Sequence, residues 1–258
     1  MPQGICKLCL QTKDLKNSHL MPAAMYKYIQ APSLQNPNPM VVGRERIITT
    51  SKQVKDYLLC SGCEDLFNKN GEKEVLKWAC KEKQFPLGER LAVAMPHHQF
   101  GDATAFSGAD IGINTDKFAY FALSVIWRAA VHQWDTPTGK STVLYLGPPE
   151  DPIRRFLLGE TGFPDEAAVV LTICADVYSQ NAFFMPSRVL NFQGMCFVFL
   201  TLGLHFMVYI GRDAGRILHD VCCVRSPARL IYQRDCTKKT IEVYRDLVMS
   251  REASKRNI

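Results

Sequence analysis

The sequence predicts an α+β protein, in which a small zinc-stapled module precedes a larger domain with an antiparallel sheet and helices. Three observations favour this class. Two C-x-x-C pairs lie near the N-terminus, on either side of residues 10–59. Apolar residues recur at helical spacing from Thr115 onward, and two apolar runs flank a turn at Leu202 and Gly203. The first pattern predicts a metal staple, the second a long amphipathic helix and the third a β-hairpin.

The cysteine pairs predict a structural zinc site. C-x-x-C spacing lets two thiolates bind one tetrahedral metal, and two such pairs supply a full ligand set. A small module needs this staple, because Zn–thiolate bonds contribute folding free energy directly. We expect one Zn²⁺ to be held by Cys6, Cys9, Cys60 and Cys63. The alternative is that one pair is coincidental, since the chain contains ten cysteines.

We expect a boundary near Pro86, which divides the chain into a zinc module (residues 1–85) and an α+β domain (residues 86–258). The expected elements of the module are an extended segment at 15–19, a helix from Pro22 to before Pro32, a loop at 31–43, a strand at 46–50, and a helix from Glu64 to Cys80 interrupted at Asn70-Gly71.

The expected elements of the second domain follow from apolar periodicity and capping residues. They are a connector at 86–115, a helix from 115 or 116 to about 134, a helix from Asp151 to Leu158, a strand at 168–175, a hairpin of 195–201 with 204–211, a strand at 229–232 and a C-terminal helix at 237–252.

One stretch is long enough to cross a bilayer. The 23 residues between Arg188 and Arg212 carry no formal charge. Polar residues and glycines interrupt them, and β-branched and aromatic residues are frequent. Two buried strands explain the stretch better, so we expect no membrane partner.

The charge distribution favours a phosphate-bearing partner. The net charge is +6, and residues 1–85 carry 13 Lys/Arg against 8 Asp/Glu, whereas residues 86–258 carry 18 against 17. A basic zinc module is the footprint expected for contact with DNA or RNA. A solvated surface of mixed charge explains the same numbers equally well.

The cysteines favour a reducing compartment. The N-terminal sequence shows no signal peptide, so we expect a cytoplasmic protein with thiols rather than a disulfide framework. Five further cysteines lie in apolar surroundings and are expected in the core, with Cys236 also structural. The five are Cys80, Cys174, Cys196, Cys222 and Cys223.

A histidine between the cysteine pairs carries the functional hypothesis. The arrangement Cys6-x-x-Cys9, Ser18-His19-x-x-Pro22 and Cys60-x-x-Cys63-Glu64 resembles the treble-clef, ββα-metal form of the HNH (His-Me finger) endonucleases, over about residues 4–80. The resemblance implies that His19 is the general base that activates water for attack on a phosphodiester. It also implies a divalent Mg²⁺ or Mn²⁺ at the scissile phosphate.

The sequence departs from this family at two positions. Ser18 stands where the family has an acidic residue, and Glu64 stands where it has Asn or His. Glu64 is an oxygen ligand suited to Mg²⁺, and Asn68 or Glu72 on the same helix could contribute. The catalytic residues expected from the resemblance are therefore His19 and Glu64.

The resemblance implies hydrolysis of DNA or RNA, with a C-terminal domain that senses a signal or binds a protein partner. By analogy of fold alone, it suggests defence or mobile-element biology. The alternative is a non-catalytic zinc-stabilised module that binds nucleic acid or protein.

Two other groups of residues are candidates for function. His97-His98 could bind a metal, although an exposed pair is commoner by chance. Trp127, Arg128 and His132 predict core packing, in which Arg128 either snorkels to the surface or pairs with a carboxylate, or alternatively a pocket lined by all three.

Overall fold

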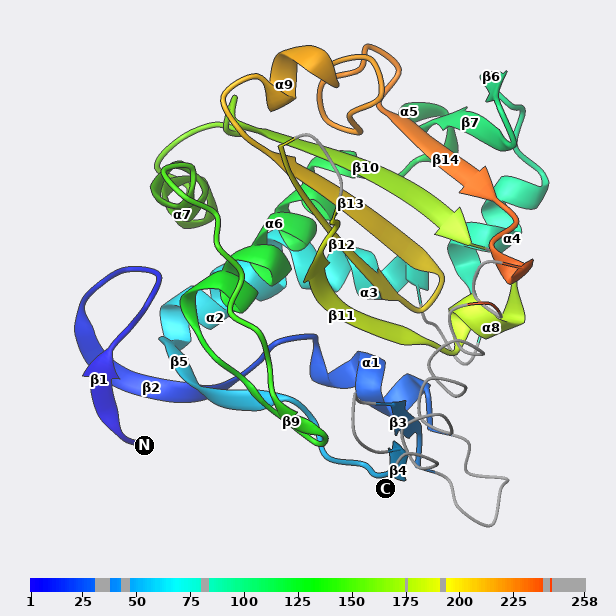
Figure 1. Ribbon diagram of the computed structural model, residues 1–258. Coiled ribbons are helices and arrows are strands. Elements are labelled where there is room, and N and C mark those ends of the chain that lie inside the picture. Colours follow the sequence, from blue (N-terminus) through cyan, green and yellow to red (C-terminus); the bar gives the residue numbers. More distant parts are fainter. Residues whose placement is uncertain are drawn as a thin grey trace.

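The structure is a computed structural model (Figure 1). It describes residues 1–30, 38–42, 47–79, 84–174, 176–190, 194–238 and 242, and every structural statement here concerns those residues. Mixed α/β architecture is confirmed: a small three-stranded sheet, a seven-stranded sheet, two short hairpins and several helices.

The small sheet has the antiparallel order β1-β2-β5, with β1 at Gln3–Ile5, β2 at Thr12–His19 and β5 at Lys55–Cys60. The turn between β1 and β2 carries the first cysteine pair. Leu15 of β2 lies opposite Cys60 of β5, and α2 (Ser61–Phe67) begins directly after Cys60. The pairing of β2 with β5 therefore brings both cysteine pairs to one end of the sheet.

The helix at the second pair begins earlier than predicted, at Ser61, and contains Cys63. α2 leads without a break into a π-helical stretch, η1 (Asn68–Glu72), and then into α3 (Lys73–Ala79). The predicted interruption at Asn70-Gly71 is wrong, because the chain widens into one π-helical stretch and continues. Gly71 allows the π-helical stretch to pack closely against the main chain at Phe121, since a Cβ on residue 71 would lie 3.0 Å from the Cα of Phe121.

The rest of the module is short elements. α1 (Ala23–Tyr28) begins after Pro22, and β4 (Ile47–Thr49) confirms the strand predicted at 46–50. β4 pairs with β3 (Met40–Val42), which lies inside the segment predicted as loop. The rest of that loop, residues 31–37 and 43, lies outside the described residues.

The large sheet has the order β11-β12-β13-β10-β14-β7-β6. Its strands are β6 (His98–Phe100), β7 (Ala103–Ser107), β10 (Ala167–Cys174), β11 (Phe183–Arg188), β12 (Met195–Thr201), β13 (Leu204–Ile210) and β14 (Leu230–Arg234). The hairpin of β12 and β13 is confirmed. Leu202 and Gly203 form its turn, both with positive φ, which is the backbone of a tight hairpin.

The prediction of a purely antiparallel sheet is wrong at one place. β10 and β14 pair in parallel, whereas all the other neighbours are antiparallel. The path of the chain explains this pair. β13 ends with Ile210 opposite Ala167, at the start of β10. The connection, which contains α9 (Ala214–Ile217), crosses that end of the sheet, so β14 leaves in the direction of β10.

The predicted connector at 86–115 is also wrong. It contains α4 (Pro86–Ala92), β6, β7 and α5 (Gly108–Ile111). Pro86 starts a helix, because a first-turn proline loses no hydrogen bond, and Leu87 and Leu91 are buried on one face. The other elements are α7 (Glu150–Leu158), α8 (Val177–Gln180) and the short hairpin of β8 (Asp135–Thr136) and β9 (Gly139–Lys140).

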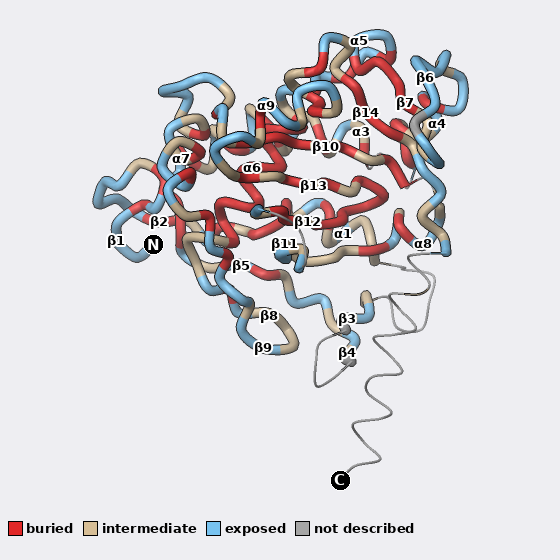
Figure 2. The backbone as a smooth tube through the Cα atoms, turned by 45° about the horizontal axis from the view of Figure 1, so that its top comes forward, coloured by how far each residue is buried: buried red, intermediate tan, exposed pale blue. Residues whose placement is uncertain are grey.

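The helix predicted from Thr115 is confirmed as α6 (Thr115–Val131), and it lies in the core. It packs against η1, α3, α7 and β13, and Figure 2 shows buried residues continuing from α6 into the large sheet. One cluster of buried apolar side chains contains Phe67 of the module and Phe121 of α6. The two predicted parts therefore share a core, and the boundary near residue 86 stays a prediction.

The remaining sequence predictions concern cysteines, the membrane and the C-terminus. A disulfide joins Cys174 to Cys236, so the prediction of thiols is wrong for this pair, although Cys174 is buried as expected. Cys196, Cys222 and Cys223 are free and buried. No helix in the described part of the chain is long and apolar enough to cross a membrane. Cys80 and most of the predicted helix at 237–252 lie outside the described residues.

Candidate metal centre and adjoining pocket

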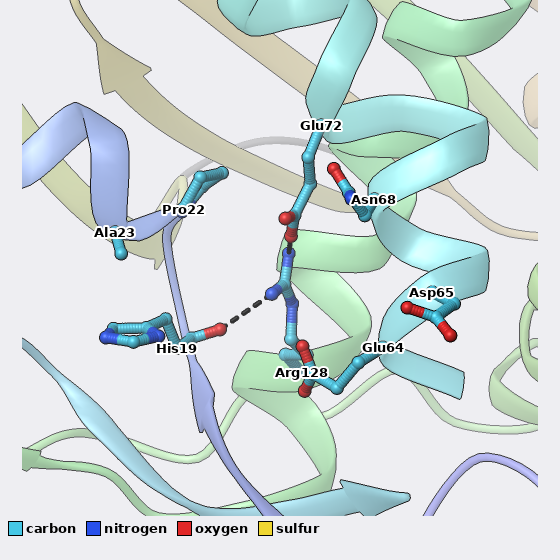
Figure 3. A pocket seen from close by; sticks show the side chains of 8 residues that line it. All are labelled: His19, Pro22, Ala23, Glu64, Asp65, Asn68, Glu72 and Arg128. Atoms are coloured by element: carbon cyan, nitrogen blue, oxygen red, sulfur yellow. Dashed lines mark hydrogen bonds and ion pairs between the residues drawn. The ribbon is translucent and has the colours of Figure 1, made fainter. Parts of the chain in front are cut away.

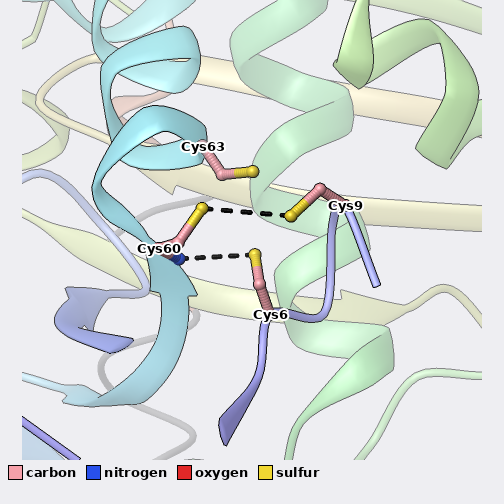
Figure 4. Close-up of side chains that lie close together, drawn as sticks. All are labelled: Cys6, Cys9, Cys60 and Cys63. Carbon is pink, nitrogen blue, oxygen red and sulfur yellow. Dashed lines mark hydrogen bonds between the residues drawn. The ribbon is translucent and has the colours of Figure 1, made fainter. Parts of the chain in front are cut away.

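The four cysteines of the two pairs converge, as predicted (Figure 4). Their sulfur atoms all lie within 4.8 Å of one another, and the Sγ atoms of Cys9 and Cys60 are 3.9 Å apart. Tetrahedral Zn–S bonds of about 2.3 Å imply S–S separations of about 3.8 Å. The donor set and its spacing fit one zinc ion.

The surrounding backbone supports thiolates at this cluster. The Cys60 N–H donates to Cys6 Sγ at 3.3 Å, and a hydrogen bond from Cys63 lowers the pKa of Cys6 to about 4. The same hydrogen bond to Cys6, together with burial, raises the pKa of Cys63. Thiols this close cannot all ionise unless a cation offsets their charge. Arg154 of α7 also donates to the Leu8 carbonyl at 3.0 Å, which fixes the first turn from the second part of the chain.

A polar pocket of about 240 Å³ lies next to the metal centre (Figure 3). Both predicted catalytic residues, His19 and Glu64, line it. His19 ends β2, and Glu64 lies one residue after the metal ligand Cys63 in α2. The lining is His19, Pro22, Ala23, Glu64, Asp65, Asn68, Glu72 and Arg128.

His19 is held in the neutral state that a general base requires. Its ring is half-buried, and burial lowers its pKa, with further lowering by the charges of Lys55 and Arg128. Hydrogen bonding to Gln53 and the charge of Glu72 oppose this shift. The Nε2 atom lies 2.7 Å from Gln53 Oε1. In Figure 3 the main-chain carbonyl of His19, and not its ring, faces Arg128.

Glu64 places an unpartnered oxygen at the pocket. Its Oε1 atom is buried and accepts no hydrogen bond in the described structure. Burial raises the pKa of Glu64, although hydrogen bonding to Ser18 and the charge of Arg128 lower it. A buried carboxylate oxygen without a partner is a candidate ligand for a cation or a water molecule. The donor chemistry therefore fits Mg²⁺ or Mn²⁺.

Ser18 does not take the place of the family's acidic residue in the pocket. Its side chain is 1% exposed and is not part of the lining. The hydroxyl accepts a hydrogen bond from the Leu59 N–H at 3.1 Å, and its one proton is shared between the Lys16 carbonyl, 3.4 Å away, and the Glu64 carboxylate. Ser18 thus supports the pairing of β2 with β5.

Arg128 reaches the pocket from α6. Its side chain is 1% exposed and pairs with Glu72, with Nη2 3.0 Å from Oε1, which confirms the prediction of a carboxylate partner. The alternative prediction, a pocket lined by Trp127, Arg128 and His132, is wrong for Trp127 and His132. Trp127 is fully buried in the core, and His132 pairs with Asp56 at 2.9 Å outside the lining.

The metal-ligating groups of the described residues are few. Only the four cysteines form a group of three or more such side chains that converge on one point. His19, Glu64 and Glu72 share a pocket without forming such a group. The His97 and His98 rings contact each other, with centroids 5.2 Å apart, and belong to no metal-ligating group of the described chain.

Sequence reasoning missed two residues of the lining, Ala23 and Asp65, and did not connect Arg128 with His19. Asp65 follows Glu64 directly, so its place at the start of the helix was the available clue. Comparisons with known proteins name no relative: the chain matches no protein-family model, no curated protein and no solved structure.

Proposed function

We propose that the N-terminal part is an HNH-like treble-clef module that holds a structural Zn²⁺ and hydrolyses phosphodiester bonds of DNA or RNA with a divalent cation. One observation carries this proposal. His19 and Glu64, to which the resemblance to the HNH endonucleases assigns the roles of base and cation ligand, line one pocket beside the four-cysteine cluster. The cluster joins the turn that leads into β2 to the start of α2, the two elements that carry His19 and Glu64.

His19 supplies the proton acceptor. In the tautomer in which Nε2 donates to Gln53 Oε1, Nδ1 is the atom that accepts a proton from water. The lowered pKa keeps the ring neutral at pH 7, so the base is ready without prior deprotonation. Gln53 fixes the orientation of the ring.

Glu64 would hold the divalent cation, with Asp65 and Asn68 as nearby oxygen donors in the same lining. When bound, Mg²⁺ or Mn²⁺ stabilises the charge that develops on the scissile phosphate. The lining includes three carboxylates, which would repel a bare phosphate. The cation requirement thus follows from the residues of the pocket.

The excess of basic residues supports a nucleic-acid substrate. Residues 1–85 hold 13 Lys/Arg against 8 Asp/Glu, so the module that carries the pocket is also the more basic part of the chain. An excess of basic residues in the part of the chain that carries an acidic pocket is consistent with a polyanion that is bound through its backbone and cut at one phosphate.

Incubation of the purified protein with plasmid DNA and with RNA, in Mg²⁺ or Mn²⁺, tests the proposal. We expect cleavage that stops on addition of EDTA and is lost in His19→Ala. The matched control is His219→Ala, an exposed histidine outside the pocket whose ring contacts only Asp220 among the described partners. Equal inactivity of wild type and His19→Ala on both substrates in both metals contradicts the proposal.

One observation favours the second candidate, a zinc-stabilised binding module without catalysis. In the described residues only the cysteines form a converging metal-ligating group. The Glu72 carboxylate already pairs with the Arg128 guanidinium, so it is less available to a cation. A non-catalytic module would bind DNA or RNA without cutting it, with an affinity that falls steeply as salt is added. Absence of salt-sensitive binding would point instead to a protein partner.

A further inference from the structure

Arg128 is a buried charge in the most buried helix of the structure. Thirteen residues of α6 are buried, and the Arg128 side chain is 1% exposed. Taking a guanidinium out of water is costly unless its donors are satisfied and its charge is paired. A residue that only filled space at this position would be apolar. The partners of Arg128 therefore indicate what the charge is for.

Two of those partners belong to the helix itself. Nε donates to the Ser124 carbonyl at 3.2 Å, and Nη2 donates to Ser124 Oγ at 3.3 Å. The guanidinium also lies over the Phe67 ring, 5.1 Å from its centroid. These contacts fix the orientation of the guanidinium plane relative to the pocket.

The other two partners belong to the pocket. Nη1 donates to the His19 carbonyl at 2.6 Å, and Nη2 donates to Glu72 Oε1 at 3.0 Å. His19 is the last residue of β2, and Glu72 is the last residue of η1. One side chain therefore links the strand that carries the base to the helix that carries the acidic residues.

We propose that Arg128 is a positioning residue of the pocket, which fixes the main chain at His19 and the carboxylate of Glu72 from inside the protein. This inference rests on the proposed function, because it concerns the same site. It makes the second part of the chain a component of that site. An arginine is required, since a planar fork with five donors can bond all these acceptors and a lysine cannot. Arg128 acts through the His19 main chain and the Glu72 carboxylate, to which it is bonded.

The titration of the His19 ring, followed by NMR in the full-length zinc-loaded protein, tests this role without any need for activity. Arg128→Met removes a cation near the ring and leaves Glu72 without its partner. The pKa of His19 should therefore rise. The other charged neighbour, Lys55, is unchanged. Arg128→Lys should fail to restore the wild-type titration and linewidth, because its ammonium cannot bond both acceptors.

Arg225→Met is the matched control. Arg225 is also mostly buried, pairs with Asp165, donates to the Pro164 carbonyl at 2.7 Å and lies 5.1 Å from the Phe163 ring centroid. The Arg225→Met protein should be less stable than wild type, and the titration of its His19 should be unchanged. Arg128 is only structural, and the proposal is overturned, if the pKa of His19 is the same in wild type, Arg128→Met and Arg225→Met. This outcome requires that Arg128→Met folds.

A second variant keeps the proposal testable if Arg128→Met does not fold. Glu72→Gln retains the guanidinium but removes the negative charge, so the pKa of His19 should fall; an unchanged value overturns the proposal. In a cleavage assay, Arg128→Lys should lower kcat at least tenfold with little change in KM, and equal activity to wild type contradicts the positioning role. Absence of cleavage by wild type would remove the proposed function, and the NMR titration would then decide the role of Arg128 by itself.

Discussion

Arg128 donates a 2.6 Å hydrogen bond to the main-chain carbonyl of His19, although 109 residues separate the two in the sequence. The bond joins a buried helix of the second part to the last residue of a strand in the zinc module. The pocket is therefore a product of both parts of the chain, and changes far from the cysteines should affect it.

Loss of one zinc ligand should unfold the module. Structural zinc sites supply binding free energy on the order of 10 kcal/mol that is also folding free energy. Cys60→Ser should therefore lose the single zinc per chain, measured by elemental analysis, and should lower Tm. Cys196→Ala, a change at a free buried cysteine outside the cluster, should keep the metal. Full zinc content in Cys60→Ser would contradict a four-cysteine site.

The ring of His19 should make the protein less stable in mild acid. Burial lowers its pKa in the folded state, so the unfolded chain binds the proton more tightly. The stability from the neutral ring is fully present above the unfolded value near 6.5 and is lost as pH falls from there through the lowered folded pKa. Urea unfolding at pH 7.5, 6.5 and 5.5 should show a smaller decrease for His19→Gln than for wild type. His219→Gln should follow wild type, and identical pH dependence of all three would be inconsistent with a buried, neutral His19.

Gly71 should be essential for the contact between η1 and α6. A Cβ on residue 71 would lie 3.0 Å from both Cα and N of Phe121, and these are backbone atoms that cannot move alone. We expect Gly71→Ala to cost about 1–3 kcal/mol through overpacking. Gly62→Ala is the control, because a Cβ in that helix meets nothing within 4 Å and should gain up to about 1 kcal/mol. Urea denaturation measures both, and a neutral Gly71→Ala would show that the helices do not approach so closely.

Glu64→Gln should separate stability from function. The change keeps the shape of the side chain but removes a carboxylate whose burial is unfavourable, so the free energy of unfolding at pH 7 should stay the same or increase. Cation binding should weaken, which would raise the Mg²⁺ concentration for half-maximal cleavage by about tenfold or more.

The control for that change is Glu74→Gln on α3, whose carboxylate bonds the Trp78 indole and lies outside the pocket lining. Its Mg²⁺ dependence should match wild type. An unchanged Mg²⁺ dependence in Glu64→Gln would remove Glu64 from the cation site.

Local patterns in the sequence predicted a large share of this structure. The spacing of Cys6, Cys9, Cys60 and Cys63 was enough to predict their convergence, because the ligand geometry of zinc is nearly invariant. The positive-φ turn at Leu202-Gly203 between two apolar runs likewise defined its hairpin. The resemblance to the HNH endonucleases implied roles for His19 and Glu64, and both line one pocket.

The misses share a physical cause, which is dependence on distant partners. Gly71 is a helix breaker by local propensity, and only its contact with Phe121 shows why a glycine is needed within a continuous helix. The parallel direction of β14 follows from where β13 ends, which no local pattern encodes. Ser18 occupied the family's acidic position in the sequence, yet the Leu59 N–H turns its hydroxyl into the sheet. The pocket partners of Arg128, Glu72 and His19, lie 56 and 109 residues away, beyond any periodicity.

The central claim is that the pocket beside the zinc cluster cuts phosphodiester bonds with His19 as base. Single-turnover cleavage of end-labelled DNA and RNA in Mg²⁺ or Mn²⁺ tests it most directly, with wild type and His19→Ala each verified to hold one zinc per chain. We predict cleavage by wild type and a rate at least a hundredfold lower for His19→Ala. Equal rates for the two proteins, or no cleavage by either while zinc and fold are intact, would contradict it.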